Sequence, residues 1–381
     1  MRVSKGWIAG LVLTGVTAGA VAQEETVSKK EFDALQRQVT ELKALLNAEN
    51  NALAEAEASR TLNETLEEVA DALPEAMVFG ALLEVEAGYN HTDSEDASDI
   101  ALATVALGAG WQLSDRVRAD LTFLYEEDDT PFDVDQAIIT LGNTEEFPLY
   151  LQAGKMYVPF GHLDSFFISD PIVLELSEAL ETGALFGFEK NGFVVSMTVF
   201  NGDVDTDGED QVDNAVLAAS YGIGNDDASV DFGVSWIRNI MDADSLTAFA
   251  EDDGYTYTAD DTGGLNAWVT AAFGPATFIG EYVTALDEIE IDGFDTGFEP
   301  ESLNLELGVA INDRIEVAGK YEHSRGVLDA FAENRYGVMC GCLLSETEMC
   351  STCLALEYMK EDFGAGAEDV DLVTMQLALE F

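Results

Sequence analysis

Three carboxylates at alternate positions, Asp203, Asp205 and Asp207, are followed by Gly208 in a pattern typical of calcium-binding loops. Carboxylates at this spacing converge on one hard cation, and the glycine permits the sharp turn that such a loop needs. The twelfth position is Asn214 rather than the bidentate glutamate of an EF-hand, and no flanking helix is predicted. A Ca²⁺ site and an ordinary acidic surface loop therefore both stay open, and no other cofactor is predicted.

Four cysteines cluster around one predicted turn near the end of the chain. They are Cys340, Cys342, Cys350 and Cys353. In an oxidising compartment an even, clustered set favours disulfides, although the C-x-C and C-x-x-C spacings are also compatible with tetrahedral zinc. A Cys342–Cys350 bridge across the turn is the easiest one sterically. We expect a disulfide in preference to a metal, and we assign neither a functional role.

The three histidines, His91, His162 and His323, do not form a recognisable catalytic set with any serine and aspartate. Nucleophilic catalysis needs a nucleophile and a base close together, and nothing in the sequence marks such a pair. We therefore do not expect an enzyme. His162 is expected to be a hydrogen-bonding residue of a loop rather than a catalyst or an iron ligand.

A stretch from Gly154 to Pro171 could instead carry the chemistry of a pore. It begins as an alternating strand that should end at Pro159 and Gly161, because proline has no amide hydrogen for the ladder and glycine relaxes the backbone. The following residues, to about Ala179, are too apolar for a free surface loop and too irregular for a strand. We predict that this segment folds into the interior of a transmembrane β-barrel.

Alternating runs that would build such a barrel extend from Met77 to Phe381, and we count about sixteen. The connections alternate between tight turns, such as Ser114-Asp115 and Asn312-Asp313, and long acidic loops. Outer-membrane barrels have short periplasmic turns and longer external loops. The predicted fold is thus an all-β transmembrane barrel of about sixteen antiparallel strands, in which the segment after Gly154 is the third external loop.

The ends of the chain predict its compartment. Residues 1–22 resemble a signal peptide, with Arg2 and Lys5, a short apolar run and small residues at the cleavage site. Residues 23–75 are predicted to hold a periplasmic α-helical coiled coil and a hinge at Pro74, with a heptad seam that Glu49 interrupts. A helix lying against the barrel is the alternative. Residues 76–381 would form the barrel in the outer membrane, in contact with its lipids.

The composition is strongly acidic, with Lys+Arg 17 against Asp+Glu 74 and a formal net charge of −57. A chain with this charge repels nucleic acid and anionic membrane surfaces at long range, so no nucleic-acid partner is expected. Hydrophobic residues make up 47% of the chain, which argues against a disordered acidic protein.

Strand alternation assigns side chains to the water-filled lumen of the barrel. The third strand would present Val117, Leu121 and Phe123 to lipid and its polar residues to the lumen. The side chains predicted to line the constriction and set its selectivity are Lys155, His162, Asp164, Asp170, Arg116, Arg118, Arg314 and Lys320.

Several motifs together resemble the LbtU-type siderophore porins of gammaproteobacteria. They include Gly154-Lys155-Met156-Tyr157-Val158-Pro159-Phe160-Gly161, Phe166-Phe167-Ile168-Ser169-Asp170-Pro171, Phe186-Gly187-Phe188-Glu189, Phe200-Asn201-Gly202-Asp203, Ala355-Leu356-Glu357-Tyr358 and the carboxy-terminal Gln376-Leu377-Ala378-Leu379-Glu380-Phe381. The Gly-Lys…Pro-Phe-Gly pattern is also similar to phosphate-selective porins. The resemblance implies an outer-membrane barrel that takes up a ferric siderophore.

We therefore predict a porin or receptor for a small solute, with a ferric siderophore as the implied cargo and a homotrimer as the expected assembly. Two alternatives stay open: a general or ion-selective porin, and a structural outer-membrane anchor tethered through its coiled coil. The sequence does not identify the cargo or its charge.

Overall fold

The computed structural model describes residues 77–127, 130–206, 211–225, 227–252, 257–258, 260–291, 297–326, 331–347, 349–364 and 367–381. Backbone contacts divide the chain into Met1–Pro74 and Glu75–Phe381, and every described residue belongs to the second unit. The predicted signal peptide (1–22) and coiled coil (23–75) lie outside the described residues, so both stay predictions.

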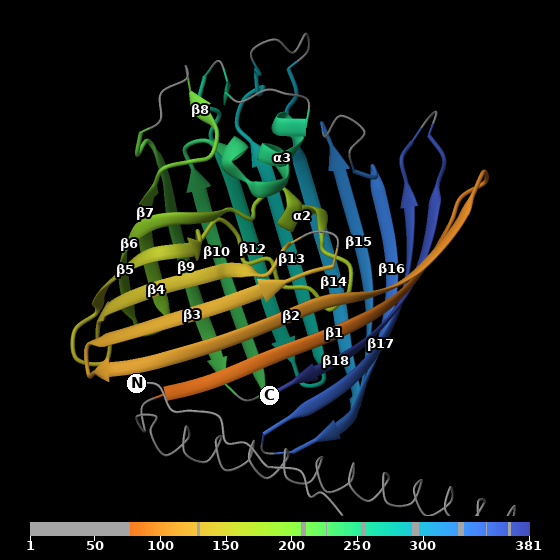
Figure 1. Ribbon diagram of the computed structural model, residues 1–381, viewed down its shortest axis with the longest axis horizontal. Coiled ribbons are helices and arrows are strands. Elements are labelled where there is room, and N and C mark those ends of the chain that lie inside the picture. The colour runs from red at the N-terminus through yellow and green to blue at the C-terminus, as the bar shows by residue number, and fades with distance from the viewer. Residues whose placement is uncertain are drawn as a thin grey trace, which may run out of the picture. The chain divides into compact units, whose positions relative to one another are not determined.

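In the described part of the chain, sixteen antiparallel strands form one closed barrel (Figure 1). Neighbours in the chain are neighbours in the barrel, and β1 closes it against β18. The strands are β1 (Met77–His91), β2 (Asp96–Ser114), β3 (Val117–Tyr125), β4 (Asp133–Gly142), β5 (Leu149–Tyr157), β6 (Leu180–Lys190), β7 (Phe193–Phe200), β9 (Asn214–Asn225), β10 (Ala228–Ile237), β12 (Gly264–Phe273), β13 (Ala276–Ala285), β14 (Glu301–Asn312), β15 (Ile315–Arg325), β16 (Asn334–Glu346), β17 (Ser351–Asp362) and β18 (Val370–Glu380).

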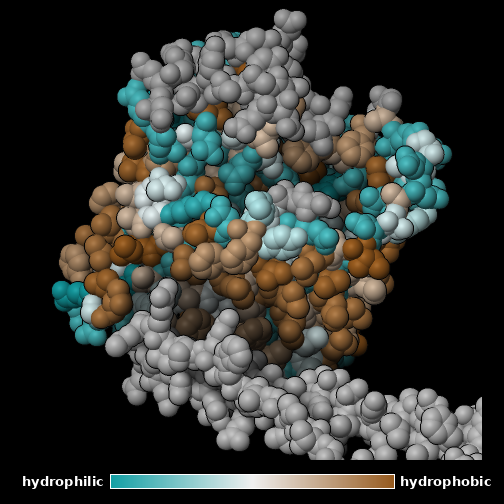
Figure 2. Space-filling view, viewed as in Figure 1, coloured by the Kyte–Doolittle hydropathy of each residue, from teal (hydrophilic) through white to brown (hydrophobic). Residues whose placement is uncertain are grey.

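Alternating hydropathy explains why these strands close into a barrel. On β14, Asn304 and Glu306 are at most 1% exposed, whereas Leu307 is 51% exposed on the other face. Successive side chains of a strand point to opposite faces, so the polar set faces inward and the apolar set outward. Figure 2 shows hydrophobic side chains gathered over the outer wall visible in that view. The predicted sixteen-stranded antiparallel barrel is confirmed.

The carboxy-terminal residue completes the closure. The backbone of Phe381 pairs in both directions with Ala81 of β1, through hydrogen bonds of 2.7 and 3.0 Å. Closure matters energetically because a strand left at an open edge would present unpaired amide and carbonyl groups to lipid.

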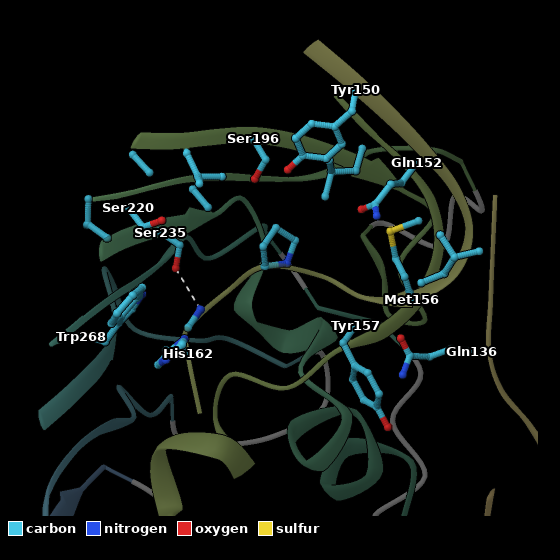
Figure 3. A pocket seen from close by; sticks show the side chains of 18 residues that line it. Gln136, Tyr150, Gln152, Met156, Tyr157, His162, Ser196, Ser220, Ser235 and Trp268 are labelled. Atoms are coloured by element: carbon cyan, nitrogen blue, oxygen red, sulfur yellow. Dashed lines mark hydrogen bonds between the residues drawn. The ribbon is translucent and has the colours of Figure 1, made fainter. Parts of the chain in front are cut away.

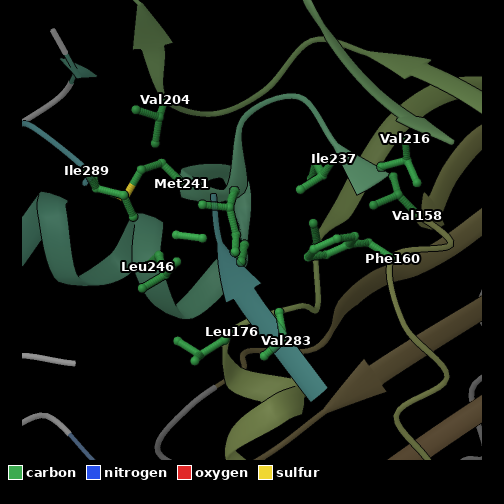
Figure 4. Packing of buried hydrophobic residues seen from close by; sticks show 14 of the residues in the cluster. Val158, Phe160, Leu176, Val204, Val216, Ile237, Met241, Leu246, Val283 and Ile289 are labelled. Atoms are coloured by element: carbon green, nitrogen blue, oxygen red, sulfur yellow. The ribbon is translucent and has the colours of Figure 1, made fainter. Parts of the chain in front are cut away.

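Connections at one end of the barrel pack together into an apolar core (Figure 4). They carry the helices α2 (Ile172–Glu175) and α3 (Asp244–Asp252), the 3₁₀ turn η1 (Ile240–Asp242), and the two-residue strands β8 (Asp205–Thr206) and β11 (Tyr257–Thr258). Leu176, Val204, Met241 and Ile289 come from four different connections, and none is more than 6% exposed. The connection between β5 and β6 is therefore held against the other long connections at this end.

Candidate functional site

The connection between β5 and β6, residues 158–179, is the element around which the site is built; we call it the β5–β6 segment. Its base is closed by a 2.9 Å hydrogen bond from the amide of Val158 to the carbonyl of Ala179. Gly161 has a φ of +114°, and a Cβ there would lie 2.7 Å from Oε1 of Glu281. Glycine is required at this position both for the backbone conformation and for the close approach.

Four buried glutamates on other strands accept hydrogen bonds from the segment, and we call them the latch glutamates: Glu281 on β13, Glu306 on β14, Glu322 on β15 and Glu357 on β17. Glu281 accepts the backbone amides of His162 and Leu163, both at 2.9 Å. Glu306 accepts the amide of Phe166 at 2.8 Å. A carboxylate accepts such bonds strongly because it is charged, which offsets part of the cost of burying it.

Further hydrogen bonds join the segment to Glu357 on β17 and to Glu322 on β15. Glu357 accepts the amides of Ile168 at 2.7 Å and Ser169 at 3.1 Å. Glu322 accepts the amide of Ile172 at 2.7 Å, at the start of α2. Because β13, β14, β15 and β17 are not neighbours of β5 or β6 in the barrel, these bonds tie the segment to inward-facing side chains of distant strands.

Two cations balance part of this buried negative charge. The Nζ atom of Lys320 lies 3.3 Å from Glu306 and 3.7 Å from Glu322, and all three side chains are 0% exposed. Arg335 contacts Glu322 at 3.4 Å and donates to the carbonyl oxygen of Asp170 at 2.9 Å. The latch is thus a mixed-charge network in which each cation neutralises carboxylates that would otherwise be unpaired.

Aromatic side chains of the segment rest on glycines of the wall. A Cβ on Gly308 of β14 would lie 2.5 Å from the ring of Phe166, and a Cβ on Gly337 of β16 would lie 2.5 Å from the ring of Phe167. Both distances are far below a normal van der Waals separation, so a side chain at either glycine would clash with the ring. Because these two glycines have no side chain, the rings of the segment can lie against the wall. This packing adds to the hydrogen bonds that hold the segment.

The inner face of β3 carries an exposed ion pair near the short-turn end of the strand. Arg118 and Asp120 lie 2.7 Å apart there, and their side chains are 57% and 32% exposed. Lys320 on β15, which contacts the segment, is by contrast 0% exposed. Water therefore reaches this part of β3 but not the side chains of β15 that contact the segment.

An acidic cavity of about 460 Å³ lies between α2, α3, β4 and β5. Its ionisable lining comprises Lys155 and the carboxyl groups of Glu126, Asp133, Asp135, Asp170, Glu175, Glu178 and Asp244. Lys155 donates to the carbonyl of Val134 at 3.0 Å. Burial, reinforced by the charge of Asp244, raises the pKa of Glu178 to about 7. This cavity attracts cations, because acidic groups outnumber its one lysine.

A neutral cavity of about 350 Å³ lies on the other side of Pro159 and Gly161, against β4–β12 (Figure 3). None of its eighteen lining residues is Asp, Glu, Lys or Arg. His162 stacks on Trp268 with ring centroids 4.1 Å apart and forms a 2.9 Å contact with Asp164. The two cavities share Tyr157, so they adjoin.

The structure brings together some of the predicted pore residues and separates others. Lys155 and Asp170 line the acidic cavity, His162 and Asp164 pair on the segment, and Lys320 lies beneath it. Arg118 lies near the short-turn end of β3, where it is 57% exposed. Two predicted constriction residues lie away from the segment, in the exposed turns at the ends of strands: Arg116, which pairs with Glu146 at 2.6 Å, and Arg314, between β14 and β15.

These two placements correct the predicted constriction. Alternation assigns a side chain to a face of the sheet but not to a height along the barrel. Arg314 precedes Lys320 by six positions, which corresponds to roughly 20 Å along a strand. Alternation assigns Glu322 to the lumen, but the contacts of the latch glutamates and Arg335 with the segment were not predicted. Each is a charged residue on the inward face of an alternating strand, which is a usable signal for a lumen contact.

The predicted metal and disulfide residues have different outcomes. All four cysteines are free thiols, so the predicted Cys342–Cys350 disulfide is not formed in this structure. In the register of β16 and β17, Cys342 lies opposite Leu354. Within the described ranges no three His, Cys, Asp or Glu side chains gather as a metal site would require. Asp207 and the side chain of Asp205 lie outside the described residues, so calcium binding with Asp203 stays a prediction.

Among the helices that the structure describes, none is long and apolar enough to cross a membrane.

The fold is that of outer-membrane porins. An anion-selective porin from Comamonas acidovorans superposes with a TM-score of 0.56 at 10% identity, over 80% of this chain and 98% of that one. The outer-membrane channel DcaP of Acinetobacter baumannii gives a TM-score of 0.55 at 12% identity, over 80% of this chain and 97% of that one. At these identities the likeness concerns the fold alone.

Sequence comparison gives relatives that are described as UPF0422 proteins. A UPF0422 protein of Legionella pneumophila strain Lens is 26% identical over 224 residues, which are 56% of this chain and 39% of that protein. A UPF0422 protein of Coxiella burnetii is 24% identical over 202 residues, 46% of this chain and 43% of that protein. The chain thus matches only about two fifths of the length of these relatives. No protein-family model matches the chain. No siderophore porin is among these proteins, so the LbtU resemblance stays a hypothesis.

Proposed function

We propose that this protein is an outer-membrane channel for small solutes, whose passage runs between the β5–β6 segment and the inner wall of β1–β3. The observation that carries the proposal is the set of hydrogen bonds from the segment to the latch glutamates on β13, β14, β15 and β17. A segment held in this way would lie in the lumen and narrow it, and the 57% and 32% exposure of Arg118 and Asp120 on β3 supports an opening beside it.

The outer membrane is the proposed location, because the outward faces of many strands carry exposed apolar side chains. Phe79 and Leu83 of β1 are 55% and 40% exposed, and Val338 of β16 is 59% exposed. Such side chains are stable against lipid and unfavourable against water. We further propose that residues 23–75 lie in the periplasm and that self-association there gives a trimer.

The charge of the acidic cavity bears on the cargo. A ferric siderophore is the cargo that the sequence resemblance implies, and many such chelators carry carboxylates of their own. Seven carboxyl groups against one lysine favour a cation or a neutral solute over an anionic chelate. We therefore propose a cation-preferring channel, and we retain a siderophore as cargo only in an uncharged or cationic form.

Planar-bilayer recording of the purified full chain tests the proposal. We expect discrete ion-conducting steps and a reversal potential in a salt gradient that reports preference for cations. A correctly folded barrel that gives no conductance would support the alternative of a structural anchor. Growth of a strain that lacks the gene, under iron limitation with and without an added siderophore, tests the cargo: unchanged growth removes the siderophore from the proposal.

A further inference from the structure

The neutral cavity differs in character from the rest of this acidic molecule. The chain carries a net charge of −57, and the adjoining acidic cavity is lined by seven carboxyl groups. The lining of the neutral cavity nevertheless contains no Asp, Glu, Lys or Arg, and its one histidine, His162, is paired with Asp164. A charged solute entering this space would lose water without gaining an ionic partner from the lining, which is unfavourable.

The lining does offer uncharged hydrogen-bonding groups. Tyr150, Gln152, Ser196 and Ser220 present phenol, amide and hydroxyl groups, and each of these groups both donates and accepts. Such a set matches a solute that carries several hydroxyl groups, because every solute hydroxyl likewise donates and accepts. The volume of about 350 Å³ lies within the range of small-molecule sites.

Two aromatic rings give this cavity firm walls. A Cβ on Gly187 would lie 2.0 Å from the ring of Tyr150, so that ring lies directly against the backbone of β6. A Cβ on Gly233 would lie 2.6 Å from the ring of Trp268, whose plane is also stacked with His162 at 4.1 Å and 13°. Rings held in this way do not need to be ordered when a solute binds, which lowers the entropic cost of binding.

The neutral cavity borders another cavity at the short-turn end of the barrel. This third cavity, of about 450 Å³, shares Val194, Ser220 and Trp268 with it and continues to Gly192 and Asn225, at the turns that follow β6 and β9. Its lining contains one carboxylate, Asp231, which does not line the neutral cavity. This arrangement would let a solute approach the neutral cavity from the short-turn end.

We propose that the neutral cavity is a binding site for an uncharged, hydroxyl-bearing solute of about monosaccharide size. This inference rests on the proposed channel function and names a solute class for it. The phenol of Tyr150 and the amide of Gln152 would bind hydroxyl groups, and the absence of charge from the lining would select against ionised analogues.

Isothermal titration calorimetry on the detergent-purified full chain tests the site directly. D-Glucose, D-gluconate and protonated D-glucosamine serve as probes because they share a carbon skeleton and differ in charge. We expect saturable binding of glucose, at least about tenfold weaker binding of both charged probes, and about fivefold weaker glucose binding in Tyr150→Phe, which loses one hydrogen bond.

Ala218→Leu on β9 would fill the cavity and abolish glucose binding. Ala215→Leu lies on the same strand but on its outward face, and it serves as the matched control. Equal affinity for the three probes, or no glucose binding by a chain that retains the mobility of a folded barrel on unheated gels, would overturn the site. Bilayer recording keeps the two proposals apart, because a conducting channel without glucose binding contradicts this inference alone.

Discussion

The backbone amide of Ile168 donates a 2.7 Å hydrogen bond to the carboxylate of Glu357, a residue 189 positions later in the chain. The bond joins the β5–β6 segment to a strand on a distant part of the barrel wall. Glu357 is 1% exposed, so water does not replace the segment as its partner.

Removing the buried cation of the latch should destabilise the barrel strongly. Lys320→Met leaves Glu306 and Glu322 without their shared partner, and breaking a buried pair in this way costs about 3–5 kcal/mol. Lys360→Met is the matched control, because Lys360 pairs with Asp369 where both side chains are 40% or more exposed. That variant should leave the free energy of unfolding nearly unchanged, because water and salt screen an exposed pair. Unfolding in urea, followed by tryptophan fluorescence, measures both; equal losses would contradict the role of the buried network.

Adding one methyl group at Gly337 should displace the segment. A Cβ there meets the ring of Phe167 at 2.5 Å, so Gly337→Ala should cost about 1–3 kcal/mol through overpacking and loosen the segment. Gly341→Ala lies on the same strand, where the nearest atom is the sulfur of Met339 at 3.7 Å, and it should be nearly neutral. Limited proteolysis within residues 158–179 provides the measurement, and identical cleavage of both variants would count against the packing.

Cation preference should increase as the pH rises from about 5 to 8. Burial raises the pKa of Glu178 to about 7, so this carboxyl group is mostly protonated at pH 5 and charged at pH 8. The raised pKa of Glu178 also lowers the free energy of unfolding as the pH rises above the ordinary pKa of a glutamate. In that range the folded state retains a proton that the unfolded chain has lost.

Reversal potentials in a KCl gradient at the two pH values measure this change in selectivity. Glu178→Gln removes the titrating group and should reduce the change. A full pH response in that variant would assign the effect to other carboxyl groups.

Thiol titration should find four free thiols in the denatured, unreduced protein, since all four cysteines are free in the structure. Two free thiols would instead indicate one disulfide, as the clustering of the cysteines predicts for an oxidising compartment.

Much of the fold could be predicted because a membrane barrel repeats one simple rule. Leu303, Leu305 and Leu307 alternate with Ser302, Asn304 and Glu306 along β14, and the same alternation marks the other strands. Turn residues such as Asn312-Asp313 then mark the strand ends. The order of strands followed without further assumptions, since each strand of such a barrel pairs with the next.

The site could be predicted only in part because its contacts are not local in sequence. The end of the alternation and Pro159 mark a break after β5. Lys155 and Asp170 were identified as polar residues near that break. The partners of the segment, Glu281 and Glu357, lie more than a hundred positions away, and their roles depend on the path that the chain takes after β5. The two-residue alternation within a strand gives no information about the path of the segment.

Single-channel conductance of the Glu306→Ala, Glu357→Ala double variant tests the central claim most directly. The substitutions remove acceptors of the amides of Phe166, Ile168 and Ser169, and each buried amide left without a partner costs about 1–3 kcal/mol. Glu145→Ala, at an exposed carboxylate in the turn between β4 and β5, is the control. We predict a larger unitary conductance for the double variant than for the wild-type chain and the control. Equal conductance in three correctly folded barrels would contradict the claim that the β5–β6 segment narrows the channel.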